Sequence, residues 1–146
     1  MDTSLLDKAI VFAVKAHQGV ERRGKDFPYI VHPMEAVSIA ATMTGDQELL
    51  AAAALHDTVE DTDVTLDDIR REFGERVAKL VEEESDVFME GVSEEASWHA
   101  RKQASMERLS KASRDAKIVA LSAKLSNARA IHRDFKEKGD AIWNLF

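Results

Sequence analysis

The stretch LLAAAALHDTVEDT, residues 49–62, gives the strongest indication of the fold of this chain. Its first seven residues are apolar without interruption, which is typical of a helix that is buried on all sides. The run ends in His56 and Asp57, and Glu60 and Asp61 follow about one turn later. These acids would meet at a helix end that already carries partial negative charge, so their repulsion must be offset. A divalent cation is the simplest candidate, because imidazole and carboxylate together suit manganese, iron or zinc.

The alternative interpretation makes His56 an ordinary histidine at a helix end and the acids a solvated turn. A His-Asp pair alone would favour that alternative, but the apolar run and the second acidic pair favour a metal site, an acid/base site or both. One segment rarely supplies every ligand of an ion, so a further ligand is expected elsewhere. His32 is a candidate because Pro33 after it suits the first turn of a helix. The alternative for His32 is a capping or surface histidine.

The composition is that of a soluble globular protein, with 45% hydrophobic and 32% charged residues. The 146 residues fit one domain, 1–146, with a real core. Absence of cysteine excludes disulfides and thiolate chemistry. No apolar stretch is long enough to span a bilayer, and no secretion signal is present, so we expect a cytoplasmic protein without a membrane partner. The net charge of −7 argues against broad neutralisation of nucleic-acid phosphates, although residues 22–25 form a local basic patch.

Hydrophobic periodicity predicts an all-α protein with a few breaks at Gly and Pro. The first helix is expected around Leu5–Val14, ending near Gly19, and a polar loop should follow at 20–31. The acidic segment 86–95 is predicted to be a mobile loop. The apolar end 142–146 indicates either a truncated domain or an end that packs on a partner, with a homo-oligomer as one possibility. Further helices are expected at 34–43, 48–59, 65–73, 75–84, 97–111 and 114–133, with a short one after residue 139.

A longer pattern runs through the chain and resembles a known family. Its main segments are AHQG at 16–19, RRGKDFPYIVHP at 22–33 and HDTVEDT at 56–62. Shorter matches are FG at 73–74, SW at 97–98, RK at 101–102 and KLSNAR at 124–129. In this order, over nearly the whole chain, the segments resemble the HD superfamily of metal-dependent phosphohydrolases. Within it, the chain is similar to the RelA/SpoT-type hydrolase domain and to small alarmone hydrolases.

The resemblance implies an HD-type helical bundle around one ion, usually manganese. The ion would be held by His32, His56, Asp57 and a fourth ligand on a late helix. The implied reaction removes the 3′-pyrophosphate from guanosine tetra- or pentaphosphate. Glu60 and Asp61 match the pair that positions water and substrate. Their carboxylates could orient the water or take its proton, because a divalent ion brings the pKa of bound water toward neutrality.

The resemblance also implies a substrate site. Asn127 matches a residue that lines the nucleotide site, and we place it among both the catalytic and the substrate-binding candidates. Arg22 and Arg23 match a basic segment that contacts substrate, in which Lys25 and Tyr29 also lie. Guanidinium groups can neutralise phosphate bidentately. The alternatives are a solvated basic loop for the arginines and simple packing for Tyr29.

The pattern fails at Ala123, where the family has an aspartate that is usually the fourth ligand. Ser122 and Ser126 are weak ligands, and Asp115 and Asp134 lie about two to three turns away. Ala123 could be an engineered substitution in an active hydrolase, a natural change that weakens activity, or a mark of a non-catalytic nucleotide-binding regulator. Other rivals are an HD-type nucleotidase or phosphatase with a different substrate, and a purely structural helical module.

Overall fold

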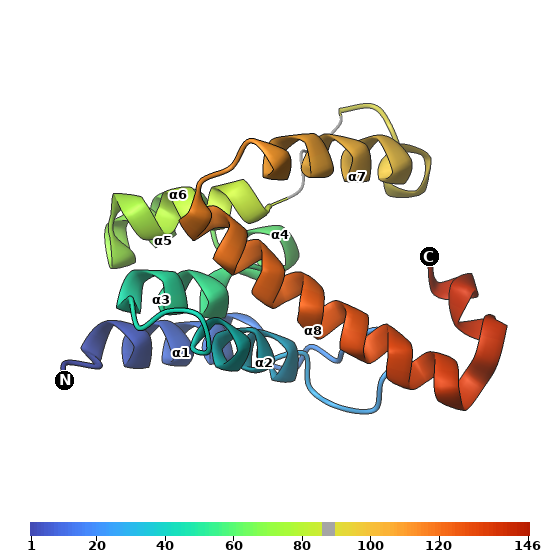
Figure 1. Cartoon of the computed structure of the whole chain (residues 1–146), viewed down its shortest axis with the longest axis horizontal. Helices are drawn as coiled ribbons and strands as arrows, with labels where there is room; N and C mark the ends of the chain where they lie inside the picture. Colours follow the sequence, from blue (N-terminus) through green and yellow to red (C-terminus); the bar gives the residue numbers. More distant parts are fainter. Residues whose placement is uncertain (86–89) are drawn as a thin grey trace.

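The computed structural model describes residues 1–85 and 90–146, and it places helix α3 (Gln47–Leu55) at the centre of the other helices (Figure 1). Asp46 caps this helix by accepting a hydrogen bond from the Glu48 backbone N–H. Every residue from Leu49 to Leu55 is buried. Four consecutive alanines leave little bulk between α3 and its neighbours. An all-apolar helix is thereby surrounded by other helices, as its sequence predicts.

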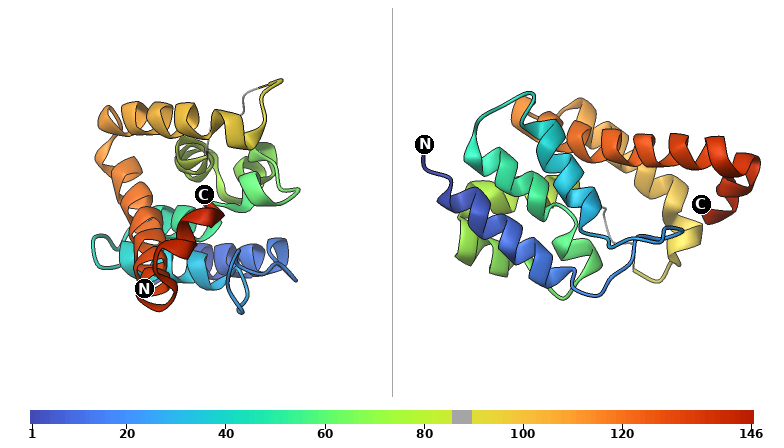
Figure 2. Two further views of the ribbon diagram at one scale, coloured as in Figure 1. Left: turned by 90° about the vertical axis from the view of Figure 1, so that its right-hand side faces the viewer. Right: turned by 90° about the horizontal axis from the view of Figure 1, so that it is seen from below.

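Helix α3 packs against α1 (Ser4–Ala16), α2 (Val31–Ala40), α6 (Glu75–Glu84) and α8 (Arg114–Lys138). The long helix α8 crosses the molecule obliquely, and it packs along α2 and reaches α6 with its N-terminal half (Figures 1 and 2). Residues from α2, α3 and α8 therefore lie close together in the interior, although they are far apart in the sequence.

The helix predicted at 48–59 is divided in the structure, so that prediction was wrong. Helix α3 ends at Leu55, and the short helix α4 (Thr58–Asp61) begins two residues after the break at His56. At the break, side chains form hydrogen bonds to backbone carbonyl groups that backbone N–H groups would bond to in a continuous helix. The His56 ring bonds to the Ala53 carbonyl at 2.7 Å, and the Thr58 hydroxyl donates to the Leu55 carbonyl at 2.8 Å.

Helix α5 (Leu66–Phe73) begins with the capping box that Thr65 and Asp68 predict. Gly74, with φ of +92°, ends it and allows an abrupt turn into α6. Helix α5 packs on α6. Phe73 also meets Phe12 of α1 edge to face, with 5.3 Å between ring centroids.

Helix α7 (Glu94–Ser110) lies on the far side of α6 and α8 from α1 (Figures 1 and 2). It begins earlier than predicted, because Ser93 caps it. Of the acidic segment expected to be a mobile loop, residues 86–89 lie outside the described residues, and 94–95 belong to α7. Helix α2 likewise begins at Val31 rather than at residue 34, so His32 lies in its first turn.

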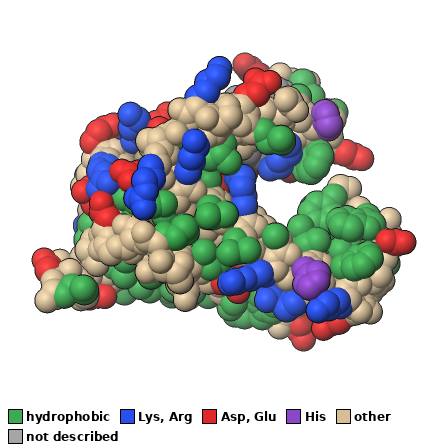
Figure 3. All heavy atoms as spheres, viewed as in Figure 1, with side chains coloured by type: hydrophobic (Ala, Val, Ile, Leu, Met, Phe, Trp, Pro, Cys, Tyr) green, Lys and Arg blue, Asp and Glu red, His purple; other side chains and the backbone are tan. Residues whose placement is uncertain are grey.

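Helix α8 continues to Lys138, beyond the predicted end, and the 3-10 helix η1 (Gly139–Leu145) packs back against it. Ile142 is buried there, while the rings of Phe135, Trp143 and Phe146 remain exposed beside one another. Figure 3 shows hydrophobic side chains gathered at this end, across a hollow from α7. Whether a partner covers them stays a prediction.

The all-α prediction is confirmed for the described residues. Their only β-structure is an isolated bridge between Glu21 and Pro28 in the loop before α2. Among the same residues, no helix has both the length and the apolar character needed to cross a membrane.

Candidate metal centre

Three buried or half-buried side chains converge where α2 meets the break between α3 and α4. The Nε2 atoms of His32 and His56 are 3.1 Å apart. The Oδ2 atom of Asp57 lies 2.9 Å from Nε2 of His56 and 3.3 Å from Nε2 of His32. Ligand atoms bound at right angles to one ion at about 2.1 Å are separated by about 3.0 Å. We call the three side chains of His32, His56 and Asp57 the metal triangle. The distances between their donor atoms match those between neighbouring ligand atoms of one ion.

Hydrogen bonds on the outer sides of the rings orient both histidines toward the metal triangle. A carbonyl oxygen only accepts, so the 2.7 Å contact with Ala53 places the proton of His56 on Nδ1 and a lone pair on Nε2. Nδ1 of His32 lies 2.8 Å from the Ser126 hydroxyl of α8, which can accept a hydrogen bond in the same way. With both rings so oriented, two lone pairs and a carboxylate oxygen face one another. Such an arrangement needs a proton or a cation at its centre.

The electrostatics also favour positive charge in the metal triangle. Burial lowers the pKa of His32, and the adjacent Asp57 carboxylate offsets part of this effect. Burial acts in the same direction on His56, but Asp57, with further help from the Ala53 carbonyl and Glu84, raises the pKa of His56 to about 9. Burial acts to raise the pKa of Asp57, yet the two imidazoles hold it well below its usual range. A carboxylate that stays ionised in the interior is suited to binding a cation.

Tyr29 links the metal triangle to the acidic end of α4. Its hydroxyl lies 2.6 Å from Asp57 Oδ2 and 3.1 Å from Asp61 Oδ2. Burial, followed by the charge of Asp57, raises the pKa values of both Tyr29 and Asp61. The phenol therefore remains a donor placed between two carboxylates. The Tyr29 ring also packs beside that of His17, with 4.9 Å between centroids, and contact of Tyr29 with a nucleotide stays a prediction. Glu60 of the same helix is exposed.

The basic loop and α8 meet beside Tyr29. The Arg22 guanidinium donates to Oδ1 of Asn127 at 2.9 Å, and it lies 5.9 Å from the centroid of the Tyr29 ring. Lys25 forms an ion pair with Asp134 of α8, which fastens the loop. Arg23 is exposed in that loop. The structure thus brings Arg22, Tyr29 and Asn127 together next to the metal triangle, while Lys25 bonds to α8.

Two residues near the metal triangle were not predicted as site residues from the sequence. Ser126 appears there only as a weak ligand, but it orients His32. Its position three residues after Ala123, on one helix face, is the signal that could have indicated this. His17 is 2% exposed, its ring lies 4.9 Å from that of Tyr29, and neither of its nitrogens has a hydrogen-bond partner among the described residues.

The residues present fit a divalent ion. Two imidazole nitrogens and one carboxylate oxygen form the single group of potential ligands, within 4.8 Å of one another, among the described His, Asp and Glu residues. A mixed nitrogen and oxygen set suits first-row divalent metals. Ala123 is buried on α8 and offers no donor atom.

Comparison with known proteins agrees with this geometry. Residues 9–146 match the model of the HD domain family. The human guanosine-3′,5′-bis(diphosphate) 3′-pyrophosphohydrolase MESH1 is 38% identical over 135 residues, which cover 90% of this chain and 72% of that protein. A guanosine-3′,5′-bis(diphosphate) 3′-pyrophosphohydrolase of Aquifex aeolicus is 47% identical over 77 residues, which are 53% of this chain. The chain spans only 11% of the length of that protein.

A solved structure shows the same architecture. A metazoan ortholog of SpoT, described as hydrolysing ppGpp, superposes with a TM-score of 0.79 and 28% identity over 90% of this chain and 72% of that one. The resemblance noted in the sequence is confirmed by the family match and by the shared helical arrangement. The chain therefore belongs to the HD-domain family, together with the MESH1 pyrophosphohydrolases.

Proposed function

We propose that this protein is a metal-dependent hydrolase that releases pyrophosphate from the 3′ position of guanosine tetra- or pentaphosphate. The observation that carries the proposal is the metal triangle, with Tyr29 linking it to Asp61 and with the Arg22–Asn127 pair beside Tyr29. The names of the human and Aquifex relatives support the substrate. A cysteine-free chain agrees with a cytoplasmic location for this activity.

His32, His56 and Asp57 would hold the ion, and we propose manganese because the mixed donor set suits it. When bound, such an ion supplies a Lewis acid that polarises a phosphoryl oxygen and brings the pKa of water toward neutrality. Ser126 and the Ala53 carbonyl keep the two imidazoles in the tautomer that presents Nε2.

The acidic pair provides the acid and base functions. Asp61, with its pKa raised by burial and by Asp57, is placed by the Tyr29 hydroxyl to accept the proton of the attacking water. The water oxygen bonds to the phosphorus that is attached to the 3′ oxygen. The bond between this phosphorus and the 3′ oxygen then breaks. The 3′ oxygen takes up the proton that Asp61 accepted from the water, so the products are a 3′-hydroxyl nucleotide and pyrophosphate. Glu60, exposed at the same helix, would orient water or substrate from the solvent side.

The arginine–asparagine pair provides the contacts to the substrate. Arg22 can bind a phosphate through two N–H groups, and the bond to Asn127 fixes its direction beforehand. Asn127 then remains close to the same phosphate or to the sugar. Arg23 would add positive charge in an otherwise acidic protein, and Lys25 would act by holding the loop against α8 through Asp134.

The test is incubation of purified protein with Mn²⁺ and guanosine tetraphosphate, with products separated by anion exchange. We expect guanosine diphosphate and pyrophosphate in equal amounts, with no reaction after chelation. Nucleoside monophosphates serve as control substrates. Orthophosphate release from these, with no action on guanosine tetraphosphate, would overturn the proposal in favour of a nucleotidase. Binding of guanosine tetraphosphate without turnover would overturn it in favour of a regulatory protein.

A further inference from the structure

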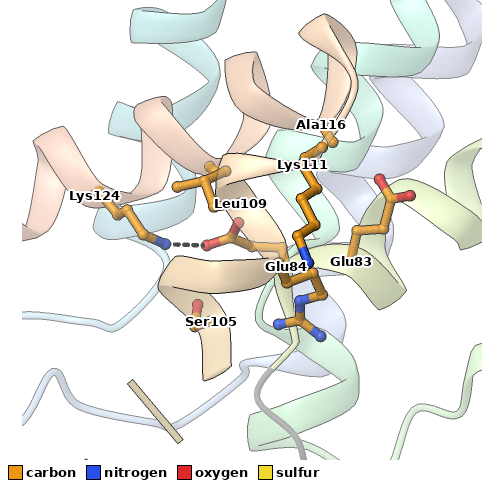
Figure 4. Close-up of a pocket in the computed structure, with 10 residues that line it drawn as sticks. Glu83, Glu84, Ser105, Leu109, Lys111, Ala116 and Lys124 are labelled. Carbon is orange, nitrogen blue, oxygen red and sulfur yellow. Dashed lines mark hydrogen bonds and ion pairs between the residues drawn. The ribbon is translucent and has the colours of Figure 1, made fainter. Parts of the chain in front are cut away.

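A cavity of about 310 Å³ lies where α6, α7 and α8 meet, and we call it the α7–α8 cavity (Figure 4). Its volume lies at the lower end of the range for small-molecule sites, about 300–1,000 Å³. None of its described lining residues belongs to the metal triangle or to the Arg22–Asn127 pair, so it is distinct from the candidate metal centre. The charged and hydroxyl-bearing residues of the lining are Arg108, Lys111, Lys124, Glu83, Glu84 and Ser105.

Two of the three cations in the α7–α8 cavity have no carboxylate partner in the described part of the chain. Lys124 forms an ion pair with Glu84 at 3.2 Å. The Arg108 guanidinium instead donates to the backbone carbonyl of Ser85 at 2.9 Å, which is a neutral acceptor. No ion pair or hydrogen bond joins the Lys111 ammonium group to residues 1–85 or 90–146. Arg108 and Lys111 lie three residues apart, where like charges on a helix surface repel each other.

The two carboxylates of the lining leave this positive charge unneutralised. Glu84 already pairs with Lys124, and its side chain is only 13% exposed. The Glu83 carboxylate points away from the ends of Lys111 and Lys124 in Figure 4, and it forms no ion pair with the described residues. The whole protein carries a net charge of −7, so a positively charged cavity is a local feature and not a property of the whole surface.

An alternative explanation is that the cations only offset the partial negative charge at the C-terminal end of α7. Arg108 lies in the last turn of this helix, and Lys111 directly follows it. The explanation accounts for these two residues, but it does not account for Lys124, which reaches the same cavity from the interior of α8. This alternative predicts no anion binding.

We propose that the α7–α8 cavity binds a phosphate-bearing anion, either inorganic pyrophosphate or the diphosphate group of a nucleotide. Arg108 would bind two phosphate oxygens, because the planar guanidinium matches their spacing. Lys111 and Lys124 would add point charges, and the Ser105 hydroxyl would donate a further hydrogen bond. The bound anion would connect α7 to α8. This site is separate from the metal centre and does not depend on the proposed function.

The primary experiment titrates ¹⁵N-labelled protein, freed of metal by chelation and dialysis, with inorganic pyrophosphate. The backbone amide NMR signals of Ala112 and Ala116, which line the cavity, report binding there. We expect these signals to shift with half-saturation below about 1 mM. Arg108→Gln should weaken this binding about tenfold or more, because charge-assisted hydrogen bonds are lost. Lys111→Gln, at a more exposed position, should weaken it about threefold or more.

Lys117→Gln is the matched control for charge. Lys117 is exposed on α8 and does not line the cavity, so its loss should change the dissociation constant less than about twofold. Equal effects of Lys111→Gln and Lys117→Gln would overturn the proposal in favour of general charge attraction. Pyrophosphate can also bind at the Arg22–Asn127 pair. Arg22→Gln should leave the shifts of Ala112 and Ala116 unchanged, and their loss in this variant would overturn a separate site.

Arg108→Lys is a second variant if the glutamine protein does not fold, as judged by thermal unfolding without ligand. It keeps the positive charge but loses the bidentate geometry, so binding should still weaken about threefold or more. A parallel titration with guanosine diphosphate distinguishes the sources of the phosphate. Binding of pyrophosphate alone supports a site for the free anion, and binding of both supports a site that also accepts nucleotides.

Binding of neither probe at about 1 mM would overturn the α7–α8 site and leave the proposed function intact. Absence of guanosine tetraphosphate hydrolysis, with normal pyrophosphate binding in the cavity, would overturn only the proposed function.

Discussion

Replacement of Ser126 by alanine should weaken metal binding, although Ser126 is not a ligand. Its hydroxyl is 2.8 Å from Nδ1 of His32, and both side chains are almost completely buried. Without the hydroxyl, the Nδ1–H group of His32 has lost its partner inside the protein. The ring can then turn, or move its proton to Nε2, and either change removes the lone pair from the metal triangle.

The expected size of the effect follows from the cost of leaving a buried donor unsatisfied, about 1–3 kcal/mol. If most of that cost falls on the form in which His32 presents Nε2, the Mn²⁺ affinity falls by about 10- to 100-fold. The lost hydrogen bond should also lower the free energy of unfolding by about 1 kcal/mol.

Calorimetric titration with Mn²⁺ and denaturant unfolding measure these two quantities. Ser122→Ala is a matched control, because Ser122 is a buried serine of the same helix whose hydroxyl donates to the Ile118 carbonyl at 2.7 Å. It should cost a similar amount of stability and leave the metal affinity nearly unchanged. If Ser126→Ala and Ser122→Ala bind Mn²⁺ equally well, the assignment of Ser126 as the residue that orients His32 is wrong.

Three further predictions concern the core, the site and the surface. Leu55→Ala should lower the free energy of unfolding by about 3–5 kcal/mol, whereas Leu121→Ala at an exposed position should cost less than about 1 kcal/mol, as denaturant titration would show. Tyr29→Phe should reduce the rate of pyrophosphate release at saturating Mn²⁺ about tenfold or more by freeing the two carboxylates that its hydroxyl bonds, and an unchanged rate would contradict this role. Arg76→Gln should lower the free energy of unfolding at pH 7 by about 0.5–1 kcal/mol. Burial acts to raise the pKa of Asp46, but Arg76 holds it below the ordinary value, so this stabilisation is present above about pH 3.9 and is lost as pH falls through the lower folded-state pKa. The difference between Arg76→Gln and the unsubstituted protein should therefore shrink in acid, and a difference that grows instead would refute the assignment.

Several features could be predicted from the sequence because they depend on neighbouring residues. The uninterrupted apolar run of α3 can be stable only in the interior, so the sequence placed it at the centre of the bundle. The capping box of α5 and the turn at Gly74 are equally local. The predicted continuity of α3 into α4 failed, because the His56 and Thr58 side chains compete for backbone carbonyls, which hydrophobic periodicity does not reveal.

Some features of the candidate site could likewise be predicted from the sequence, and others could not. The motifs identified His32, His56 and Asp57, and the structure brings their donor atoms together. Contacts between distant segments could not be predicted. The bond from Arg22 to Asn127 and the ion pair of Lys25 with Asp134 depend on how α8 crosses the loop before α2. The substitution at Ala123 is visible in the sequence.

By itself, then, the sequence determined the helical class and the central helix, because both depend on residue types at short spacing. It proposed the residues of the metal triangle through longer motifs that resemble a known family. The tertiary structure alone decided which outer groups orient those residues. Ser126 comes from a helix whose distance from His32 along the chain carries no information about its distance in space. Packing of α8 along α2 creates that proximity, since the buried apolar faces fix how the helices cross, and the polar side chains near the crossing take the positions that remain.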